Sequence, residues 1–291
     1  MGTAAAPGST PAVVLYHVPP SFYSQVARLV LVEKGVAFEP RAVVPGPPNF
    51  GTYAPWYMRL NPMGTVPTLI LDDEVLDDSR TILEVVERRF DRPTLRPHDA
   101  DAQAQVDRWV EDAYQISERV LAYGSGRMRT MGRRVNDGRR RAVLAWREKT
   151  PDMVAIYDAK LADLDQFMTD AADDATVRAQ IQGLHDKLDT LDATLDGRAF
   201  VVGDSYTLAD VIWTVTVARK IMMGDDPFAH RPHLRAWFDR MRARPSFDRA
   251  DVWTRFKPHK MLPIALREFR RHLSIAAALV ALLGAALAYL R

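Results

Sequence analysis

Strand-like and helix-like segments alternate over the first third of this 291-residue chain, and only helical patterning follows them. Short apolar runs predict four strands, over residues 13–16, 38–44, 67–71 and 74–76. Apolar residues at helical spacing predict one helix over 22–34, which Gly35 ends, and another from Ser79 to about Phe90. The order strand, helix, strand, loop, strand, strand, helix fits a small mixed sheet with helices on its faces.

This pattern predicts two folded domains. The first is an α/β domain with a thioredoxin-like fold over 13–93, and the second is an all-α domain over 98–260. A proline-bearing linker, 92–97, joins them. In the second domain, Thr207–Asp210 form a capping box, because the threonine hydroxyl and the aspartate carboxylate can each accept a backbone N–H. Residues 1–12 are small and uncharged, and we expect them to be a disordered lead-in.

The end of the chain, residues 273–290, is an uncharged and almost wholly apolar run. As a helix this run would be about 27 Å long, which approaches the thickness of a bilayer core. Arg267, Arg270 and Arg271 precede it, and positive residues beside a span stay on the cytoplasmic side. We therefore predict a C-terminal transmembrane helix that serves as a single-pass membrane anchor, with the soluble domains facing the cytoplasm. The alternative is an alanine-rich helix that packs on the domain or on a partner subunit.

Composition excludes several kinds of site. The chain has no cysteine, so it has no disulfide bond, no thiolate metal site and no catalytic protein thiol. The net charge of +2 gives no argument for nucleic acid as a partner. Seven arginines between residues 127 and 141 predict a solvated helix face or a mobile insert, with attraction to anionic membrane lipid as the alternative. His17 is a lone histidine without a second ligand at a recognisable spacing, so we expect no metal.

Three motifs resemble those of soluble glutathione transferases, in the same order and spacing. They are Asn61–Leu69, which reads NPMGTVPTL, the pair Asp78-Ser79 at the start of a helix, and Ser205–Asp210, which reads SYTLAD. The resemblance covers roughly residues 13–256. It implies the glutathione transferase fold, glutathione as the co-substrate, and a homodimer.

Two groups within this family resemble the chain more closely. Leu15–His17 and Pro55–Asn61 are similar to the ganglioside-induced differentiation-associated proteins, which carry an insert in the helical domain and a tail anchor. Extra residues around 127–175 and the apolar end of the chain match that architecture. Asp210–Val215 and Met241–Phe247 look like the tetrachlorohydroquinone dehalogenases, which stand near the zeta-class transferases.

The thiol of glutathione must ionise near neutral pH, and a hydroxyl at a helix N-terminus can stabilise the thiolate. Ser21 lies where the loop after the first strand meets the first helix, and it matches the catalytic serine of zeta-like transferases. Ser24 is the second candidate, in a Ser-Gln context that resembles theta-like enzymes. Ser21 could equally be a plain helix N-cap, and the two roles are compatible.

The resemblance also implies the residues that bind glutathione. Pro67 is cis in the family, and the backbone of the preceding Val66 would pair with the cysteinyl part of glutathione. The same cis bond would shape the loop with or without a ligand. Asp78 and Ser79 would hold the γ-glutamyl end at a helix N-terminus, and a plain N-cap is the alternative for either residue.

We therefore predict a glutathione transferase that acts on an apolar electrophile at a membrane surface, with Ser21 activating the thiol. The dehalogenases place a catalytic cysteine where this chain has Tyr23, so their protein-thiol step is unavailable. The competing interpretation is a membrane-anchored protein that interacts with partners or senses glutathione without turnover. Trp109, Tyr114 and Trp213 are expected to belong to the core rather than to the site.

Overall fold

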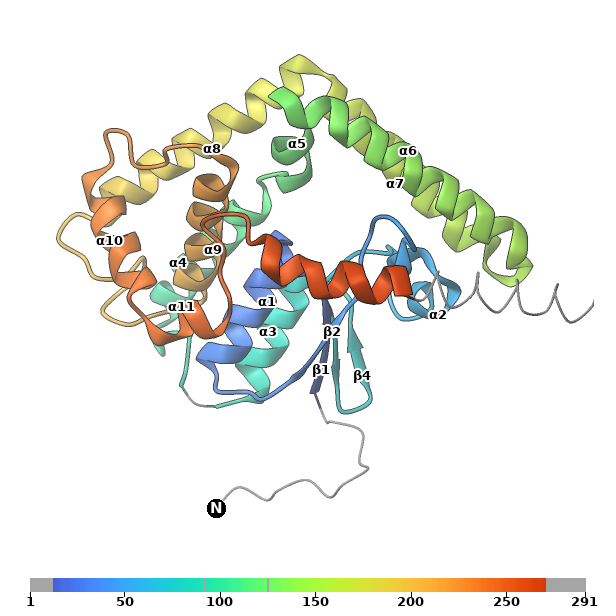
Figure 1. The fold of residues 1–291 in the computed structure, drawn as a ribbon. Helices are drawn as coiled ribbons and strands as arrows, with labels where there is room; N and C mark the ends of the chain where they lie inside the picture. Colours follow the sequence, from blue (N-terminus) through green and yellow to red (C-terminus); the bar gives the residue numbers. More distant parts are fainter. Residues whose placement is uncertain (1–12, 92, 125, 271–291) are drawn as a thin grey trace, which may run out of the picture.

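The computed structural model describes residues 13–91, 93–124 and 126–270, and its N-terminal part is built on a four-stranded sheet (Figure 1). The strands are β1 (Val13–His17), β2 (Glu39–Ala42), β3 (Thr68–Leu71) and β4 (Glu74–Leu76). Their order across the sheet is β2-β1-β3-β4. β1 pairs in parallel with β2 and antiparallel with β3, and β3 pairs antiparallel with β4. The sequence predicted these strands, and only their end residues differ.

Helices cover both faces of the sheet. They are α1 (Phe22–Glu33) and α3 (Ser79–Arg89) on one side, with α2 (Pro55–Met58) on the other. Side chains alternate along a strand, so Val13 and Leu15 of β1 join the core with α1 and α3. Val14 and Tyr16 point to the opposite face and pack with α2. Met261, in the helical residues 258–270, packs on this second cluster as well.

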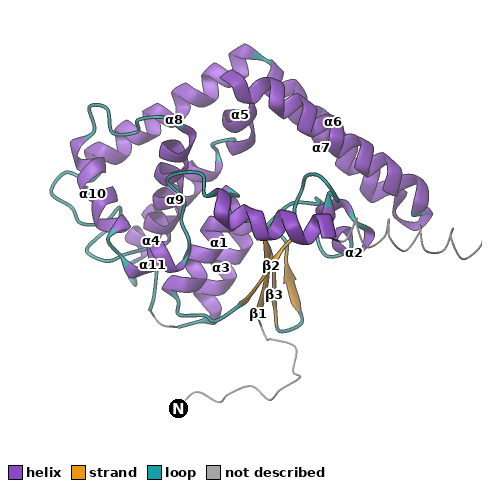
Figure 2. Cartoon of the chain, in the orientation of Figure 1, coloured by secondary structure: helices purple, strands orange, loops and turns teal. Residues whose placement is uncertain are grey.

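The second part of the chain is helical (Figure 2). Its helices are α4 (Ala100–Tyr114), α5 (Glu118–Tyr123), α6 (Gly126–Lys149), α7 (Val154–Ala172), α8 (Asp174–Thr194), α9 (Leu208–Met223), α10 (Pro232–Arg242) and α11 (Pro245–Arg249). Of two short 3-10 helices, η1 (Gly51–Tyr53) lies in the first part of the chain, between β2 and α2, and η2 (Pro151–Met153) lies between α6 and α7. Helix α9 lies at the centre, because every residue from Leu208 to Ala218 is buried.

The predicted capping box opens helix α9. The Thr207 hydroxyl and the Asp210 carboxylate both make their capping contacts. Asp210 is completely buried, and its carboxylate also accepts from the Val201 N–H at 3.0 Å and from the Trp237 indole N–H at 2.9 Å. Burial raises the pKa of Asp210, and these hydrogen bonds oppose that shift. The motif therefore stabilises the start of α9 and connects it to α10.

The two parts of the chain share one hydrophobic core. A single cluster of buried residues includes side chains of α1 and α3 together with side chains of α4, α8, α9 and α10. Helix α1 packs directly against α9. The apolar face of the thioredoxin-like part is thus covered by the helical part. The domain boundaries, 13–93 and 98–260, stay predictions.

The segment predicted as an insert, 127–175, lies mainly in α6 and α7, which pack side by side as an antiparallel hairpin (Figure 1). The hairpin reaches the sheet-containing part of the chain, since Val143 and Tyr157 share a buried cluster with Tyr53. Arginines on α6 pair with acidic residues of α7, as in the ion pair of Arg140 with Asp165 at 2.7 Å. This pairing favours the interpretation of the arginine-rich run as a solvated helix face.

The predicted transmembrane anchor requires a correction. Within residues 13–91, 93–124 and 126–270, no helix is both long and apolar enough to cross a bilayer. The longest of them, α6, α7 and α8, each carry several charged residues, which are costly in a bilayer. A fold class with a transmembrane helix and a single-pass membrane localisation are therefore not supported. The apolar run 273–290 lies outside the described residues, as does the predicted lead-in, residues 1–12.

Candidate functional site

The register of the sheet brings the three predicted glutathione-binding segments to one edge of the sheet, at the C-terminal ends of β1 and β4 and the N-terminal end of β3. Tyr16 near the end of β1 lies opposite Thr68 at the start of β3. The loop that leads to Ser21 therefore runs beside the Val66–Pro67 segment. Leu76 at the end of β4 lies opposite Leu69 of β3, so the chain that follows β4 begins near the same place.

Ser21 is the N-cap of helix α1. Its hydroxyl oxygen accepts the backbone N–H of Ser24 at 3.3 Å, which leaves the hydroxyl hydrogen available to a ligand. Ser24 is completely buried, and its own hydroxyl accepts the Val18 N–H at 3.4 Å. The geometry thus favours Ser21 over Ser24 as the residue that contacts a thiol.

The loop before Ser21 is fixed by two arginines. The buried guanidinium of Arg28 donates to the Pro19 carbonyl at 3.0 Å and to the Ala250 carbonyl at 2.7 Å. Arg219 of α9 donates to the next carbonyl, that of Pro20, at 3.2 Å. The two prolines have no N–H with which to stabilise the loop themselves. The arginines therefore help to hold Ser21, together with the Ser21 N–H, which donates to the Val18 carbonyl at 3.1 Å.

His17 supports the same loop indirectly, through its contact with Arg28. Its Nδ1 lies 3.1 Å from Nη1 of Arg28, so the neutral ring is the acceptor in this contact. Burial, followed by the charge of Arg28, lowers the pKa of His17 to about 3. The residue is therefore a structural neutral histidine. In the described part of the chain, no group of three histidine or acidic side chains is placed to hold a metal ion.

The Val66–Pro67 peptide bond is cis, as the resemblance implies. Asn61, which is completely buried, supports this loop through one amide group. Its Nδ2 donates to the carbonyls of Thr65 at 3.1 Å and Asp77 at 2.9 Å. The asparagine of the NPMGTVPTL motif therefore ties the cis-proline loop to the segment that enters α3.

Asp78 and Ser79 lie at the N-terminus of α3 and differ in their contacts. Asp78 is exposed and is the N-cap, since its carboxylate accepts the N–H groups of Arg80 and Thr81, both at 2.9 Å. Ser79 is buried, and its hydroxyl lies 2.9 Å from the Tyr114 hydroxyl. Helices α1 and α3 both begin at this edge of the sheet, and their N-termini favour an anionic ligand there.

Sequence reasoning placed Tyr114 in the core, and the structure shows it packed against the main core cluster with its hydroxyl on Ser79 of the candidate site. Its ring stacks parallel to that of Tyr23, with centroids 6.2 Å apart, so the pair connects α1 to Ser79 of α3. Burial, with Glu118 as a second cause, raises the pKa of Tyr23 to about 12. No motif marks Tyr114, which is simply the last residue of α4. Trp213 is completely buried, as predicted for a core residue.

Comparison with known proteins agrees with this arrangement. The family model for the N-terminal domain of glutathione S-transferase matches residues 15–94, and the model for the C-terminal domain matches 134–245. Tetrachloro-p-hydroquinone reductive dehalogenase of Sphingobium chlorophenolicum is 31% identical over 85% of this chain and 98% of its own length. Human ganglioside-induced differentiation-associated protein 1-like 1 is 28% identical over 84% of this chain and 75% of its own length.

A solved structure shows the same fold. The theta-class glutathione S-transferase of Xanthomonas axonopodis pv. citri, determined with glutathione bound, has a TM-score of 0.59 and 21% identity over 84% of this chain and 98% of its own. These matches confirm the resemblance and the prediction of a glutathione-dependent enzyme. The chain belongs to the glutathione S-transferase family.

Proposed function

We propose that this protein transfers glutathione to an apolar electrophile and that Ser21 activates the thiol. The observation that carries the proposal is the position of Ser21 at the N-terminus of α1, on the sheet edge that also holds the cis-proline loop and the start of α3. The Ser24 N–H polarises the Ser21 oxygen, so the hydroxyl hydrogen can be donated to the sulfur. Together with the dipole of α1, this hydrogen bond stabilises the thiolate.

The other residues bind the tripeptide. The backbone of Val66, before cis Pro67, pairs with the cysteinyl part of glutathione. The N-terminus of α3 takes the γ-glutamyl carboxylate, where Ser79 can donate its hydroxyl hydrogen while it accepts from Tyr114. Asp78 is exposed beside it and attracts the γ-glutamyl ammonium.

The proposed reaction is a nucleophilic substitution or addition at carbon. The sulfur lone pair forms the new carbon–sulfur bond, and in a substitution the leaving group departs with the electron pair of the bond that breaks. The thiol proton is released to solvent when the thiolate forms. We also propose a homodimer, because dimerisation is typical of the family, and light scattering on the purified chain tests it.

The test is a comparison of Ser21→Ala with Ser117→Ala. Ser117 is the N-cap of α5 and accepts the Val120 N–H at 3.4 Å, so its loss removes a similar cap from a different helix. Each change should lower the free energy of unfolding by about 1 kcal/mol. Only Ser21→Ala should lower kcat/KM for glutathione with an activated aryl chloride, by roughly 10²–10³-fold, as for loss of one donor to a developing anion.

Calorimetry with glutathione separates binding from activation. We expect Ser21→Ala to bind glutathione while the ultraviolet absorbance of the bound thiolate is lost. Full activity in Ser21→Ala would contradict the assignment of Ser21. Glutathione binding without turnover in the wild type would instead support a protein that senses glutathione.

A further inference from the structure

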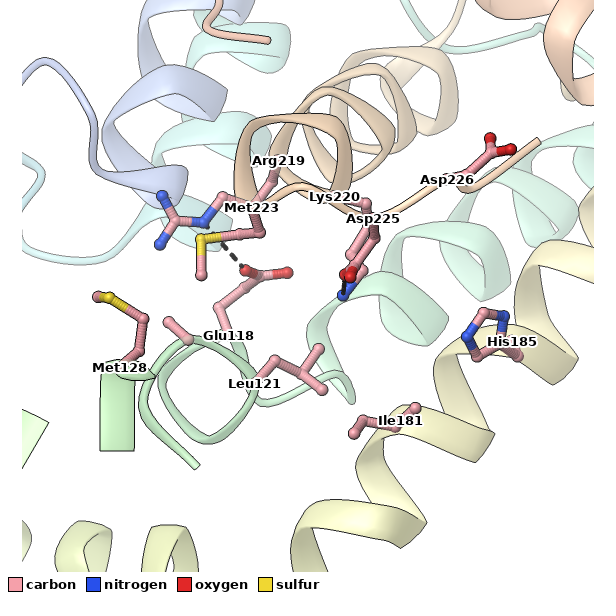
Figure 3. Close-up of a pocket in the computed structure, with 11 residues that line it drawn as sticks. Glu118, Leu121, Met128, Ile181, His185, Arg219, Lys220, Met223, Asp225 and Asp226 are labelled. Carbon is pink, nitrogen blue, oxygen red and sulfur yellow. Dashed lines mark ion pairs between the residues drawn. The ribbon is translucent and has the colours of Figure 1, made fainter. Parts of the chain in front are cut away.

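The α6–α7 hairpin connects the helical part of the chain to the sheet-containing part (Figure 1). Near its base, Met128 of α6 lines a cavity together with residues of α8 and α9 (Figure 3). Arg119 of α5 also pairs with Asp163, in the middle of α7, through two contacts of 2.9 and 3.0 Å. At the other end of the hairpin, Asp152 of η2 pairs with Arg59, which follows α2, at 2.8 Å. The hairpin is therefore fixed in the helical part and reaches α2 with its far end.

Two side chains of the hairpin donate to the backbone of residues 45–59, which we call the η1 segment. Tyr157 of α7 is completely buried, and its hydroxyl donates to the Tyr53 carbonyl at 3.0 Å. Nε of Arg139 on α6 donates to the Pro45 carbonyl at 3.0 Å. Both acceptors belong to the backbone, so these bonds constrain the path of the segment rather than one of its side chains.

The η1 segment in turn contacts the cis-proline loop. The hydroxyl of Tyr57 donates to the Thr65 carbonyl at 2.6 Å. Gly64 has a φ of +57°, and an added Cβ there would lie 2.8 Å from Sδ of Met58 and 2.9 Å from Cδ1 of Tyr53. These two side chains therefore pack directly on the backbone of the loop, and a shift of either one displaces it.

The η1 segment contains little structure that is stable by itself. η1 has three residues and α2 has four, and helices this short need tertiary contacts to form in water. Phe50, just before η1, has a φ of +48°, in the left-handed region that disfavours residues with a side chain. Tyr53 and Met58 belong to a buried cluster whose other members come from the hairpin, namely Val143, Met153, Tyr157 and Leu164. The hairpin thus supplies the buried partners of the segment.

We propose that the α6–α7 hairpin positions the cis-proline loop through the η1 segment and that Tyr157 is the positioning residue. Its hydroxyl holds the Tyr53 backbone, and the Tyr53 ring packs on Gly64. The consequence for glutathione rests on the function proposed above, in which the Val66 backbone pairs with the cysteinyl part. Affinity falls with the fraction of molecules in which the loop has the binding conformation, so a looser hairpin contact weakens binding.

The test compares Tyr157→Phe with Thr216→Val in the full chain. Thr216 is completely buried in α9, and its hydroxyl donates to the Ile212 carbonyl of the same helix at 3.0 Å, so each variant loses one neutral hydrogen bond. Such a bond changes an equilibrium constant by roughly 2- to 10-fold. Calorimetry should show that Kd for glutathione rises by roughly this factor in Tyr157→Phe only. KM should follow Kd while kcat stays unchanged, because Ser21 is held by other contacts.

Hydrogen exchange without glutathione tests the positioning separately. The N–H groups of Met63 and Gly64 donate to Oδ1 and to the carbonyl of Asn61, at 3.0 and 2.8 Å, so their exchange reports opening of the loop. Exchange at both should be roughly 2- to 10-fold faster in Tyr157→Phe and unchanged in Thr216→Val. Unchanged exchange in Tyr157→Phe, or equal acceleration in both variants, would overturn the inference. Absence of glutathione binding by the wild type would instead overturn the proposed function alone.

A second pair of variants decides the matter if Tyr157→Phe does not fold. Arg139 and Arg140 are neighbours on α6, but Arg139 donates to the Pro45 carbonyl, whereas Arg140 pairs with Asp165 inside the hairpin at 2.7 Å. Replacement of either one by Met removes the same charge. Only Arg139→Met should accelerate exchange at the two loop amides, and equal effects of the two variants would contradict the proposal.

Discussion

Replacing Arg28 by Met should weaken both the fold and the reaction. Arg28 is 5% exposed, and its guanidinium contacts four acceptors: the carbonyls of Pro19, Ala250 and Asp251, and Nδ1 of His17. Burial lowers the pKa of the guanidinium only to about 10, so the side chain is charged at neutral pH. Methionine keeps much of the length of the side chain and removes every donor.

The expected loss follows from these contacts. Each hydrogen bond to a charged group contributes about 1.5–3 kcal/mol, but the four share one desolvated cation and their contributions do not add. Arg28→Met leaves these buried acceptors without their donor, which costs about 1–3 kcal/mol for each unsatisfied group, so we expect a total loss of about 3–5 kcal/mol. The free energy of unfolding of Arg28→Met should fall by that amount, which urea denaturation measures. kcat/KM for glutathione should fall as well, because the Pro19 carbonyl no longer holds the loop before Ser21.

Arg231→Met is the matched control. Arg231 is 7% exposed in the helical part and bonds Asp189 at 2.7 Å and the Pro227 carbonyl at 3.2 Å. Its replacement should lower stability in the same range without changing kcat/KM in the folded protein. The reasoning is refuted if Arg28→Met costs less than about 1 kcal/mol, the size of an ordinary substitution. It is also refuted if the two variants have the same kcat/KM.

Two further outcomes are expected. The pKa of His17 is about 3 in the folded chain against an ordinary 6.5, so the unfolded chain takes up this proton first and stability falls as pH drops from 6.5 towards 3. The free energy of unfolding should fall by about 4–5 kcal/mol in total. Urea denaturation at several pH values measures this fall, and the same dependence on pH in His17→Asn would contradict the prediction. Tyr114→Phe removes the partner of the Ser79 hydroxyl, so KM for glutathione should rise a few fold while kcat stays unchanged. The double variant with Ser79→Ala should be no worse than Ser79→Ala alone, and additive effects would show that the two hydroxyls act independently.

Local patterns in the sequence determined the elements and the candidate residues. Alternation of apolar runs predicted the four strands, and the caps at Ser21 and Thr207 marked where α1 and α9 begin. The NPMGTVPTL motif predicted a cis bond before Pro67, which the structure contains. The strands and the caps depend on neighbouring residues, so they can be derived from the order of the chain alone, whereas the cis bond was implied only by the family resemblance.

The contacts that complete the site join residues far apart in sequence, and only the tertiary structure decided them. Arg28 bonds the carbonyl of Ala250, 222 positions away, and Tyr114 reaches Ser79 from another helix. The predicted anchor lies in residues 273–290, outside the described residues, and none of the described helices is long and apolar enough to span a bilayer. Hydropathy and periodicity describe one segment at a time. A buried donor is placed by the packing of several helices, and its partner cannot be derived from either segment alone.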